Sequence, residues 1–474
     1  MDPEGPTGKL CNWVHSLTLM DIPSDVRTRA KYLLLDGIAC ALIGAHLPWS
    51  EKAANAIFEM EPPGDSAVFG WDRKLGPLSA ALLNSSFIQG FELDDWHSEA
   101  PLHSNSILLP ALFAAVEHLS NVGGPVIDGA SFLLAYLVGL EVGPRVGNGL
   151  YGTHMLSMGW HSGAVFGPPA SSTAVCKLMN LPASLIEDAI GIACTQACGL
   201  MSAQYESEVK RMQHGFAARN GLFAALMARS GYVGIKKVFE RPYGGYLSTF
   251  GQGSGQDPPY LPDEITKELG SKWQTYGVRV KPYAAMAGTH CTVDCIRKLQ
   301  EEHPEQMKDF ESITSIRIEM AEAAYHHGGW KPTRPLTATG AQMSNAYVAA
   351  TQLVHGQVLA AQFRHDKLEL DLVWDLVNKT TCHHNTEFTQ KAMQRATVTF
   401  RDKPTLTTLV DAPRGVYPPL TNEEIVGKWR SLTRDVIDDG RRLEIERLCL
   451  GLEDIKDVME LGRLMHGITK NPIA

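Results

Sequence analysis

The sequence has no excess of positive charge, no long apolar run and no recognisable targeting segment. Its 43 Lys and Arg residues against 52 Asp and Glu residues give a net charge of -9, and this balance argues against nucleic-acid binding, which needs a basic face. No apolar run approaches the roughly 18 residues of a membrane span. The first residues, MDPEGPTGKL, carry acids and prolines instead of an Arg- and Ser-rich or apolar leader. We therefore expect a cytoplasmic protein that binds neither nucleic acid nor membrane.

Cysteine is also sparse, with nine residues in 474 and no regular spacing. Such usage predicts reduced thiols without a disulfide framework. Cys194 with Cys198, and Cys291 with Cys295, are four residues apart, a spacing that places each pair on one helix face. A zinc site would need two further ligands, for which His290 is a candidate. Because both pairs lie among apolar residues, we expect the four cysteines to be buried as small apolar side chains and to form no metal site.

Helical periodicity dominates the chain before residue 255. The segments with apolar residues at helical spacing are 26–45, 78–91, 107–119, 132–142, a helix from 183 onward, and 216–228. Ser104, Asn105 and Ser106 are predicted to cap the helix at 107, while Ser184 and Glu187 are spaced as a capping box. No alternation of strands and helices occurs here, which disfavours a doubly wound sheet.

The pattern changes after the glycine-rich run 251–255, which follows no strand and leads into prolines. This run predicts a loop at a domain boundary and not a nucleotide-binding turn. Period-two alternation predicts strands at 313–320, 396–400 and 405–410, the last two as a hairpin, with a short strand at 278–280 and a long helix at 342–363; helices return at 422–432 and 441–450. We therefore predict a mainly α fold, with a large helical domain from residues 1–272 and 413–474 and a smaller α+β domain from 273–412.

One stretch, FELDDWHSEAPLHSNSILLPAL at 91–112, concentrates acids and histidines directly ahead of an apolar helix. Five of its ionisable residues lie within ten positions, namely Asp94, Asp95, His97, Glu99 and His103. Ionisable groups at a helix entrance can meet a polar ligand, and a solvated loop whose acids cap helices is the alternative. The acidic spacing is also similar to the magnesium motif of terpene synthases, although we find no second metal motif.

Four later stretches carry polar or charged side chains that could bind the same ligand as the stretch at 91–112. His161 in GWHSG precedes a helix of small residues, whose dipole favours nearby anions. Lys210 begins KRMQHG, Lys281 follows the short strand at the domain boundary, and Tyr325 opens YHHGGWKP, whose glycines suit a lid edge. Each stretch has a structural alternative, namely a glycine-rich bend, a solvated charged face, an isolated lysine or a polar turn. Their occurrence together favours a site for an anionic ligand.

Long runs of the sequence match one known family: LGPLSAALLNSSFIQ, DDWHSEAPLHS, GWHSGAVFG, IGIACTQACGLMSAQY, VKRMQHGFAARNG and KPY. By these runs, which span nearly the whole chain, the sequence resembles the MmgE/PrpD family of 2-methylcitrate dehydratases and cis-aconitate decarboxylases. The similarity is sharpest to the itaconate-forming cis-aconitate decarboxylases. Mammalian-type decarboxylases of the family carry an additional histidine where this chain has Met286.

The resemblance implies a homodimer in which a large helical domain and a smaller α+β lid enclose the active site, without a metal or an organic cofactor. Carried over position by position, it implies a set of site residues to which we add Tyr325 as a substrate-binding candidate. The residues implied are Glu92, Asp94, Asp95, His103, His161, Lys210 and Lys281.

The reaction implied by the resemblance is removal of the methylene carboxylate of cis-aconitate, which gives itaconate and carbon dioxide. Lys210, Lys281 and protonated imidazoles would bind the three carboxylates. His103 would protonate the former vinylic carbon, with His161 binding substrate or sharing that role. The alternatives are hydration or dehydration of a citrate-like acid such as 2-methylcitrate, isomerisation of a related tricarboxylate, and a noncatalytic helical interaction protein.

Overall fold

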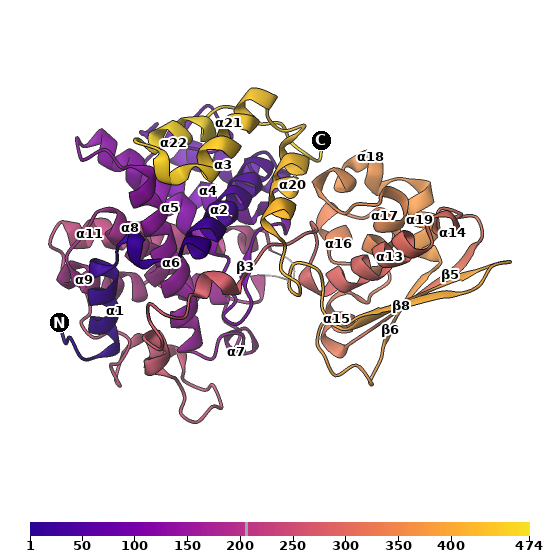
Figure 1. Cartoon of the computed structure of the whole chain (residues 1–474), viewed down its shortest axis with the longest axis horizontal. Coiled ribbons are helices and arrows are strands. Elements are labelled where there is room, and N and C mark those ends of the chain that lie inside the picture. Colours follow the sequence, from indigo (N-terminus) through magenta and orange to yellow (C-terminus); the bar gives the residue numbers. More distant parts are fainter. Residues whose placement is uncertain (204–206) are drawn as a thin grey trace. The chain divides into compact units, whose positions relative to one another are not determined.

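Many helices begin where the local sequence supplies a proline or a capping group. Pro6, Pro48 and Pro77 are the first residues of three helices, where the missing N–H leaves no bond unmade. The Asp128 carboxylate accepts a hydrogen bond from the Ser131 N–H at 2.7 Å and so starts another. These details come from a computed structural model that describes residues 1–203 and 207–474 (Figure 1). The last two residues of the run at 190–205 lie outside the described residues.

The larger of two compact units is helical and comprises Met1–Gly90, Asp94–Arg279 and Asn422–Lys470. Two short antiparallel pairs accompany its helices, β1 (Ser66–Ala67) with β2 (Lys74–Leu75) and β3 (Trp96–His97) with β4 (Val278–Arg279). The helices are α1 (Pro6–Ser16), α2 (Ser24–Gly44), α3 (Pro48–Met60), α4 (Pro77–Ile88), α5 (Ser104–Asn121), α6 (Gly129–Asn148), α7 (His154–Ser157), α8 (Ser162–Leu178), α9 (Ala183–Cys194), α11 (Gln213–Arg229), α12 (Tyr246–Phe250), α20 (Asn422–Thr433), α21 (Asp439–Leu450) and α22 (Met459–Met465).

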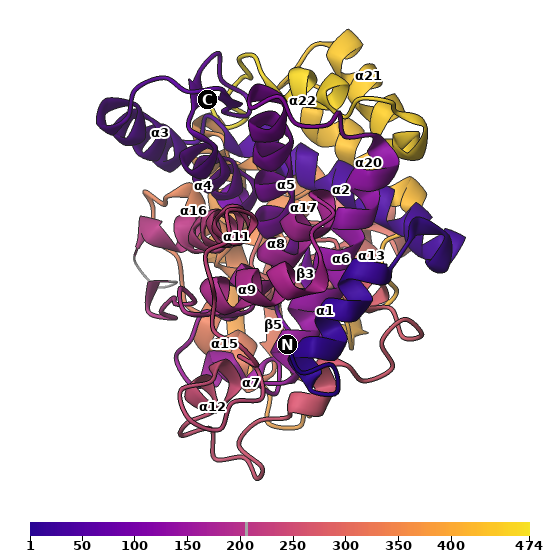
Figure 2. The same cartoon turned by 90° about the vertical axis from the view of Figure 1, so that its left-hand side faces the viewer.

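Helix α8 forms the centre of the helical unit. Every residue of α8 except Lys177 is buried, and the helix packs against α5, α6, α9 and α11 (Figure 2). Its approach to α11 is close, because the Ser171 hydroxyl donates to the Ala217 carbonyl at 2.9 Å and a Cβ at Gly221 would lie 1.7 Å from Ser171 Oγ. The absence of a side chain at Gly221 therefore permits this packing.

The smaller unit combines helices with a four-stranded sheet and comprises Phe91–Leu93, Val280–Thr421 and Asn471–Ala474. The sheet order is β6-β5-β7-β8, in which β5 runs parallel to β6 and antiparallel to β7, and β7 and β8 form a hairpin. Its elements are α13 (His290–Glu302), α14 (Pro304–Met307), β5 (Ile313–Met320), α15 (Glu322–Gly328), α16 (Ala338–Gln342), α17 (Asn345–His355), α18 (His365–Leu368), α19 (Asp371–Asn378), β6 (Thr380–His384), β7 (Gln394–Phe400) and β8 (Leu406–Val410). The predicted mainly α fold with a smaller α+β part is thus confirmed.

Three predictions about helix boundaries are wrong. Helix α5 begins at Ser104 and not at 107, so the three polar residues that we expected as caps lie inside its first turn. No side chain caps α9, which starts after Pro182, and the capping box at Ser184 is absent. The predicted helix at 342–363 is interrupted, because Ser344 caps the start of α17 and Gly356 ends it in the left-handed conformation (φ +65°).

The cysteine prediction is partly wrong. All nine cysteines, which lie within the described residues, are free thiols, and Cys291 and Cys295 are buried on α13 as expected. Helix α9, however, ends at Cys194, and Cys198 is exposed beyond it. The apolar run continues past the end of the helix, so periodicity alone overestimated its length.

Among the described residues, no single helix is long and apolar enough to cross a membrane. The pair α2 and α3, bent by 80° at their junction, passes that test of length and composition when the two are taken together.

Glu117 on α5 gives the helical unit a dependence of stability on pH. Its carboxylate accepts a hydrogen bond from the Ala67 N–H at 2.9 Å, and burial raises its pKa to about 7 from the ordinary 4.5. Between these two pH values the folded protein holds a proton that the unfolded chain releases. The free energy of unfolding contributed by this group therefore falls as pH rises from about 4.5 to 7, by on the order of 3 kcal/mol.

We predict that Glu117→Gln abolishes this component, since the amide oxygen can still accept from Ala67 and carries no charge. Urea denaturation of wild type and variant at several pH values between 4.5 and 8 should show the variant gaining relative stability as pH rises. Glu59→Gln, at an exposed position of α3, serves as the control. Parallel stability curves for wild type and Glu117→Gln would refute the assignment.

Candidate active site

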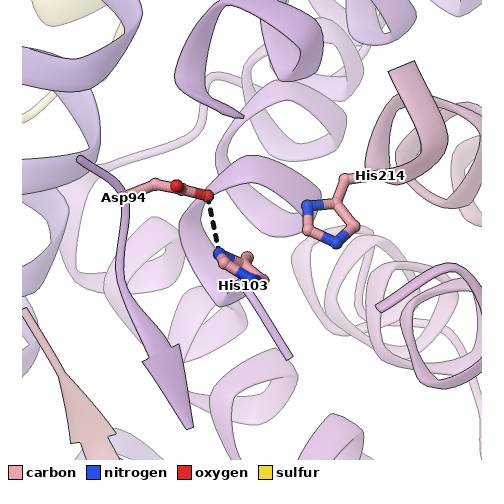
Figure 3. Close-up of side chains that lie close together, drawn as sticks. All are labelled: Asp94, His103 and His214. Carbon is pink, nitrogen blue, oxygen red and sulfur yellow. Dashed lines mark hydrogen bonds and ion pairs between the residues drawn. The ribbon is translucent and has the colours of Figure 1, made fainter. Parts of the chain in front are cut away.

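A hydrogen bond between Asp94 and His103 forms the first part of the site. His103 is the residue immediately before α5, and its Nδ1 lies 2.8 Å from Asp94 Oδ2 (Figure 3). Asp94 is buried, whereas the His103 side chain is 23% exposed. A carboxylate on Nδ1 fixes one edge of the imidazole, which leaves Nε2 on the opposite edge to act on a ligand.

Asp95 caps α5. Its two carboxylate oxygens accept hydrogen bonds from the Ser104 N–H at 3.0 Å and the Asn105 N–H at 3.1 Å, which satisfies two of the unpaired donors at the helix start. Burial, and secondarily the neighbouring Asp94 charge, raise the pKa of Asp95 to about 8. Asp95 therefore holds a proton near neutral pH and anchors the segment that carries Asp94 and His103.

His214 lies beside His103, and His161 lies beside His214. The His214 ring, in the first turn of α11, has its centroid 4.8 Å from that of His103 and 4.9 Å from that of His161. His161 is the residue immediately before α8, and both His161 and His214 are buried. The three imidazoles thus sit at the N-termini of α5, α8 and α11, which pack against one another. We call His103, His161 and His214, with Asp94, the histidine cluster.

His214 is the member of the cluster that our sequence analysis did not select. The run KRMQHG precedes the helix predicted at 216–228, but α11 begins at Gln213, so His214 is inside the helix and buried. The small and polar residues around Gly215 are compatible with a helix that starts before residue 216, and this signal could have placed His214 inside α11. The direction in which His214 points depends on the packing of α11 on α8, which no local pattern reveals.

Ser106 and Gly163 determine how His214 is held. The Ser106 hydroxyl donates to the His103 carbonyl at 2.8 Å, and Ser106 Oγ lies 2.9 Å from His214 Nδ1. Because a hydroxyl has a single proton, His214 Nδ1 must be the donor in the second bond. A Cβ at Gly163 would lie 2.1 Å from His214 Nε2, so only glycine leaves space for the ring at the start of α8.

The cluster is suited to an anionic ligand and to proton transfer. Three helix N-termini present their positive dipole ends to one place, and each helix has more than fifteen residues. Imidazoles add hydrogen-bond donors and can carry protons to a ligand. Asp94 supplies a single carboxylate that is already bonded to His103. This combination can bind carboxylates and deliver a proton to one of their carbon atoms.

Asp94, His103 and His214 each offer one ligand atom, and these atoms lie within 4.8 Å of one another. The set of one carboxylate and two imidazoles fits the ligand preferences of zinc and similar ions. An ion bound through Asp94 Oδ2 and His103 Nδ1 would replace the hydrogen bond that joins these two atoms. The absence of a metal from the reaction stays a prediction.

The remaining candidates of the helical unit lie near these helices in sequence. Lys210 is in the 3-10 helix Glu208–Met212, which leads directly into α11, and is half-buried. His97 of the acidic stretch is buried with Nδ1 accepting from the Ala100 N–H at 3.1 Å, and burial lowers its pKa to about 4. Glu99 is exposed. His97 is thus a neutral structural residue, and the acidic stretch contributes Asp94, Asp95 and His103.

The α+β unit holds the other candidates. Lys281 Nζ lies 3.1 Å from Glu92 Oε2, and both side chains are buried. Glu92 has a positive φ of 55°. A residue other than glycine adopts this backbone conformation at some cost in free energy, and such residues often occur at functional sites. Tyr325 on α15 stacks on His384 of β6, with ring centroids 6.2 Å apart. The Met286 side chain ends beside Gly288 and Gly328, since a Cβ on either glycine would lie within about 3 Å of Met286 Cε.

The family models match both parts of the chain. The MmgE/PrpD N-terminal domain covers residues 8–256, and the MmgE/PrpD C-terminal domain covers residues 283–452. Among similar proteins, a cis-aconitate decarboxylase-like protein of Aspergillus oryzae is 53% identical over 473 residues, which are 98% of both chains. A cis-aconitate decarboxylase of Aspergillus terreus is 48% identical over 478 residues, covering 99% of this chain and 97% of that protein. The human cis-aconitate decarboxylase is 25% identical over 475 residues, 97% of this chain and 94% of its own length.

These matches extend over nearly the whole chain. They agree with the resemblance inferred from the long sequence runs. The chain therefore belongs to the MmgE/PrpD family.

Proposed function

We propose that this protein is a carboxy-lyase that converts cis-aconitate to itaconate and carbon dioxide. The observation that carries the proposal is the histidine cluster, in which three imidazoles and Asp94 meet at three helix N-termini. The decarboxylase names of relatives that are 48% and 53% identical over the full chain support it. Dehydration of a citrate-like acid is the alternative that the same carboxylate-binding chemistry allows.

Substrate binding requires cations, because cis-aconitate carries three carboxylates at neutral pH. The helix N-termini of α5, α8 and α11 supply partial positive charge in a place that water reaches poorly, where such charge is worth more than in bulk solvent. We propose that His161 and Lys210 bind carboxylates of the substrate. Charge-assisted hydrogen bonds of this kind are about twice as strong as neutral ones.

Decarboxylation breaks the bond between the methylene carbon and its carboxylate and leaves the electron pair on carbon. The pair spreads across the adjacent double bond towards the carboxylate on the former vinylic carbon. Fixed donors and cations that face this developing charge lower the barrier by several kcal/mol, on the order of what one oxyanion-hole donor contributes. The delocalised carbanion is stable enough that we propose a reaction without a metal or an organic cofactor, as the family resemblance implies.

His103 is proposed as the acid that completes the reaction. Its Nδ1 stays on Asp94, so the Nε2 proton of the imidazolium is the one transferred to the former vinylic carbon. The His103 side chain is the partly exposed member of the Asp94–His103 pair, which allows it to regain a proton from solvent. Loss of the carboxylate and gain of this proton balance the conversion to itaconate.

In the α+β unit we propose Lys281, Glu92 and Tyr325 as further substrate-binding groups. The Lys281–Glu92 ion pair holds the Lys281 Nζ in a defined place. Asp95 is proposed to act by holding the start of α5. The quaternary structure and location remain proposals as well: we propose a cytoplasmic homodimer with domain limits near residues 272 and 412.

The reaction itself can be tested with EDTA-treated protein and cis-aconitate in deuterated buffer, followed by proton NMR and by carbon dioxide release. We expect itaconate with one deuterium on its saturated methylene carbon, because the acid proton exchanges with solvent. Formation of citrate or isocitrate would replace the decarboxylase proposal by the dehydratase alternative. Activity that disappears with EDTA and returns with zinc would show that a metal is required.

His103→Ala should reduce kcat by about 100-fold or more, since a positioned general acid contributes roughly that factor. Asp94→Asn should reduce kcat less, because the imidazole remains while its carboxylate partner is lost. His118→Ala, at the other end of the same helix, is the matched control. Steady-state rates and circular dichroism of all three variants check the expectation, and a near-normal rate for folded His103→Ala would remove His103 from the acid role.

A further inference from the structure

His214 lies between the other two histidines of the cluster. Its ring is tilted by 38° to that of His103 and by 57° to that of His161, with centroids 4.8 and 4.9 Å away. It is fully buried, whereas His103 is 23% exposed at its side chain. The His103 ring therefore packs against the buried His214 ring (Figure 3).

Packing against His214 matters because, among the described residues, the hydrogen bond of the His103 ring to Asp94 fixes only one edge of that ring. A hydrogen bond from Nδ1 to Asp94 holds that corner of the ring at 2.8 Å, but a single bond leaves the ring able to swing about it. The swing moves Nε2, which is at the far edge. Packing against the His214 ring restricts this motion and so sets the direction of the Nε2–H group.

His214 is itself held from both sides. Its Nδ1–H donates to Ser106 Oγ at 2.9 Å, and the Ser106 hydroxyl is bonded to the carbonyl of His103. The backbone of Gly163, at the start of α8, closes the other side near Nε2. The hydrogen-bonded chain thus connects the His214 ring to the backbone of the residue that it supports, and the two rings keep one relative geometry.

The direction of the acid matters because the carbanion left by decarboxylation can accept a proton at two carbons. A proton on the former vinylic carbon gives itaconate, which has a terminal C=CH2 double bond. A proton on the carbon that lost carbon dioxide gives citraconate, which has a methyl group and an internal double bond. The two products have the same composition, so only the position of the acid decides between them.

We propose that His214 is a positioning residue that, through His103, directs the proton to the former vinylic carbon. The inference rests on the proposed decarboxylation and concerns which isomer forms. His214 gives up no proton in this role; the proton moves from His103 Nε2 to carbon, and the electron pair of the carbanion forms the new C–H bond. Ser106 acts by holding His214.

Two variants test this role in different ways. His214→Asn keeps an amide that can donate to Ser106 and removes the rest of the ring, whereas Ser106→Ala keeps the ring and removes its anchor. Ser172→Ala is the matched control, because Ser172 is a buried serine of the helical unit whose hydroxyl donates to the Pro169 carbonyl at 3.1 Å. Each protein is incubated with cis-aconitate, and the itaconate and citraconate signals are integrated by proton NMR.

We expect kcat to fall by about 10- to 100-fold in His214→Asn, with KM within about a factor of two, since a displaced acid reacts slowly without weakening binding. The share of citraconate should rise by about tenfold or more, which corresponds to about 1.4 kcal/mol of lost selectivity between the two carbons. Ser106→Ala should change both quantities in the same direction and by less. Ser172→Ala should match the wild type.

Itaconate without added citraconate in both variants would overturn the proposal, even if the rate fell, because a lower rate alone indicates a structural effect. Wild-type rates in both variants would overturn it as well. If His214→Asn does not fold, the product ratio of Ser106→Ala decides. Failure of the wild type to form itaconate would instead refute the proposed function, so the two ideas are tested separately.

Discussion

The structure depends on one constraint: the helices α5, α8 and α11 must begin at the same place. His103 and His161 directly precede α5 and α8, and His214 lies in the first turn of α11. The helix dipoles alone would favour an anion there. The imidazoles add mobile protons, and the Asp94–His103 hydrogen bond determines which edge of one ring faces Asp94. In the proposed reaction, binding of a polyanion and protonation of carbon would therefore use the same few atoms.

Small and buried groups maintain that meeting point. Asp95 fixes the start of α5 by accepting from two backbone N–H groups, and its raised pKa keeps it protonated near neutral pH, which limits the negative charge beside Asp94. Gly163 leaves space for His214, and Gly221 permits the close contact of α8 with α11. A side chain at either glycine would have to displace an atom of the cluster or of the helix interface, so the local packing and the chemistry are linked.

Much of the fold could be predicted from periodicity and turn chemistry, including the helical part, strand β5 and the hairpin of β7 and β8, whereas β6 was not predicted. Boundaries were less predictable, because the cap of α5 is Asp95, a residue nine positions before the helix starts, and because Gly356 breaks an otherwise helical pattern. The acid and histidines around His103 could be selected from their density in sequence. His214 could not, since its place beside His103 results from helix packing across more than a hundred residues.

The most direct measurement is a titration of the histidine ring nitrogens by proton–nitrogen NMR with tricarballylate, a saturated tricarboxylate that cannot decarboxylate. If the histidine cluster binds the substrate, the signals of His103, His161 and His214 will shift together along one binding curve. The signal of His46, which pairs with Glu51 and Gly70 elsewhere in the helical unit, should stay in place. Tricarballylate that binds while the three cluster signals remain unmoved would contradict the claim that this cluster is where the substrate is held.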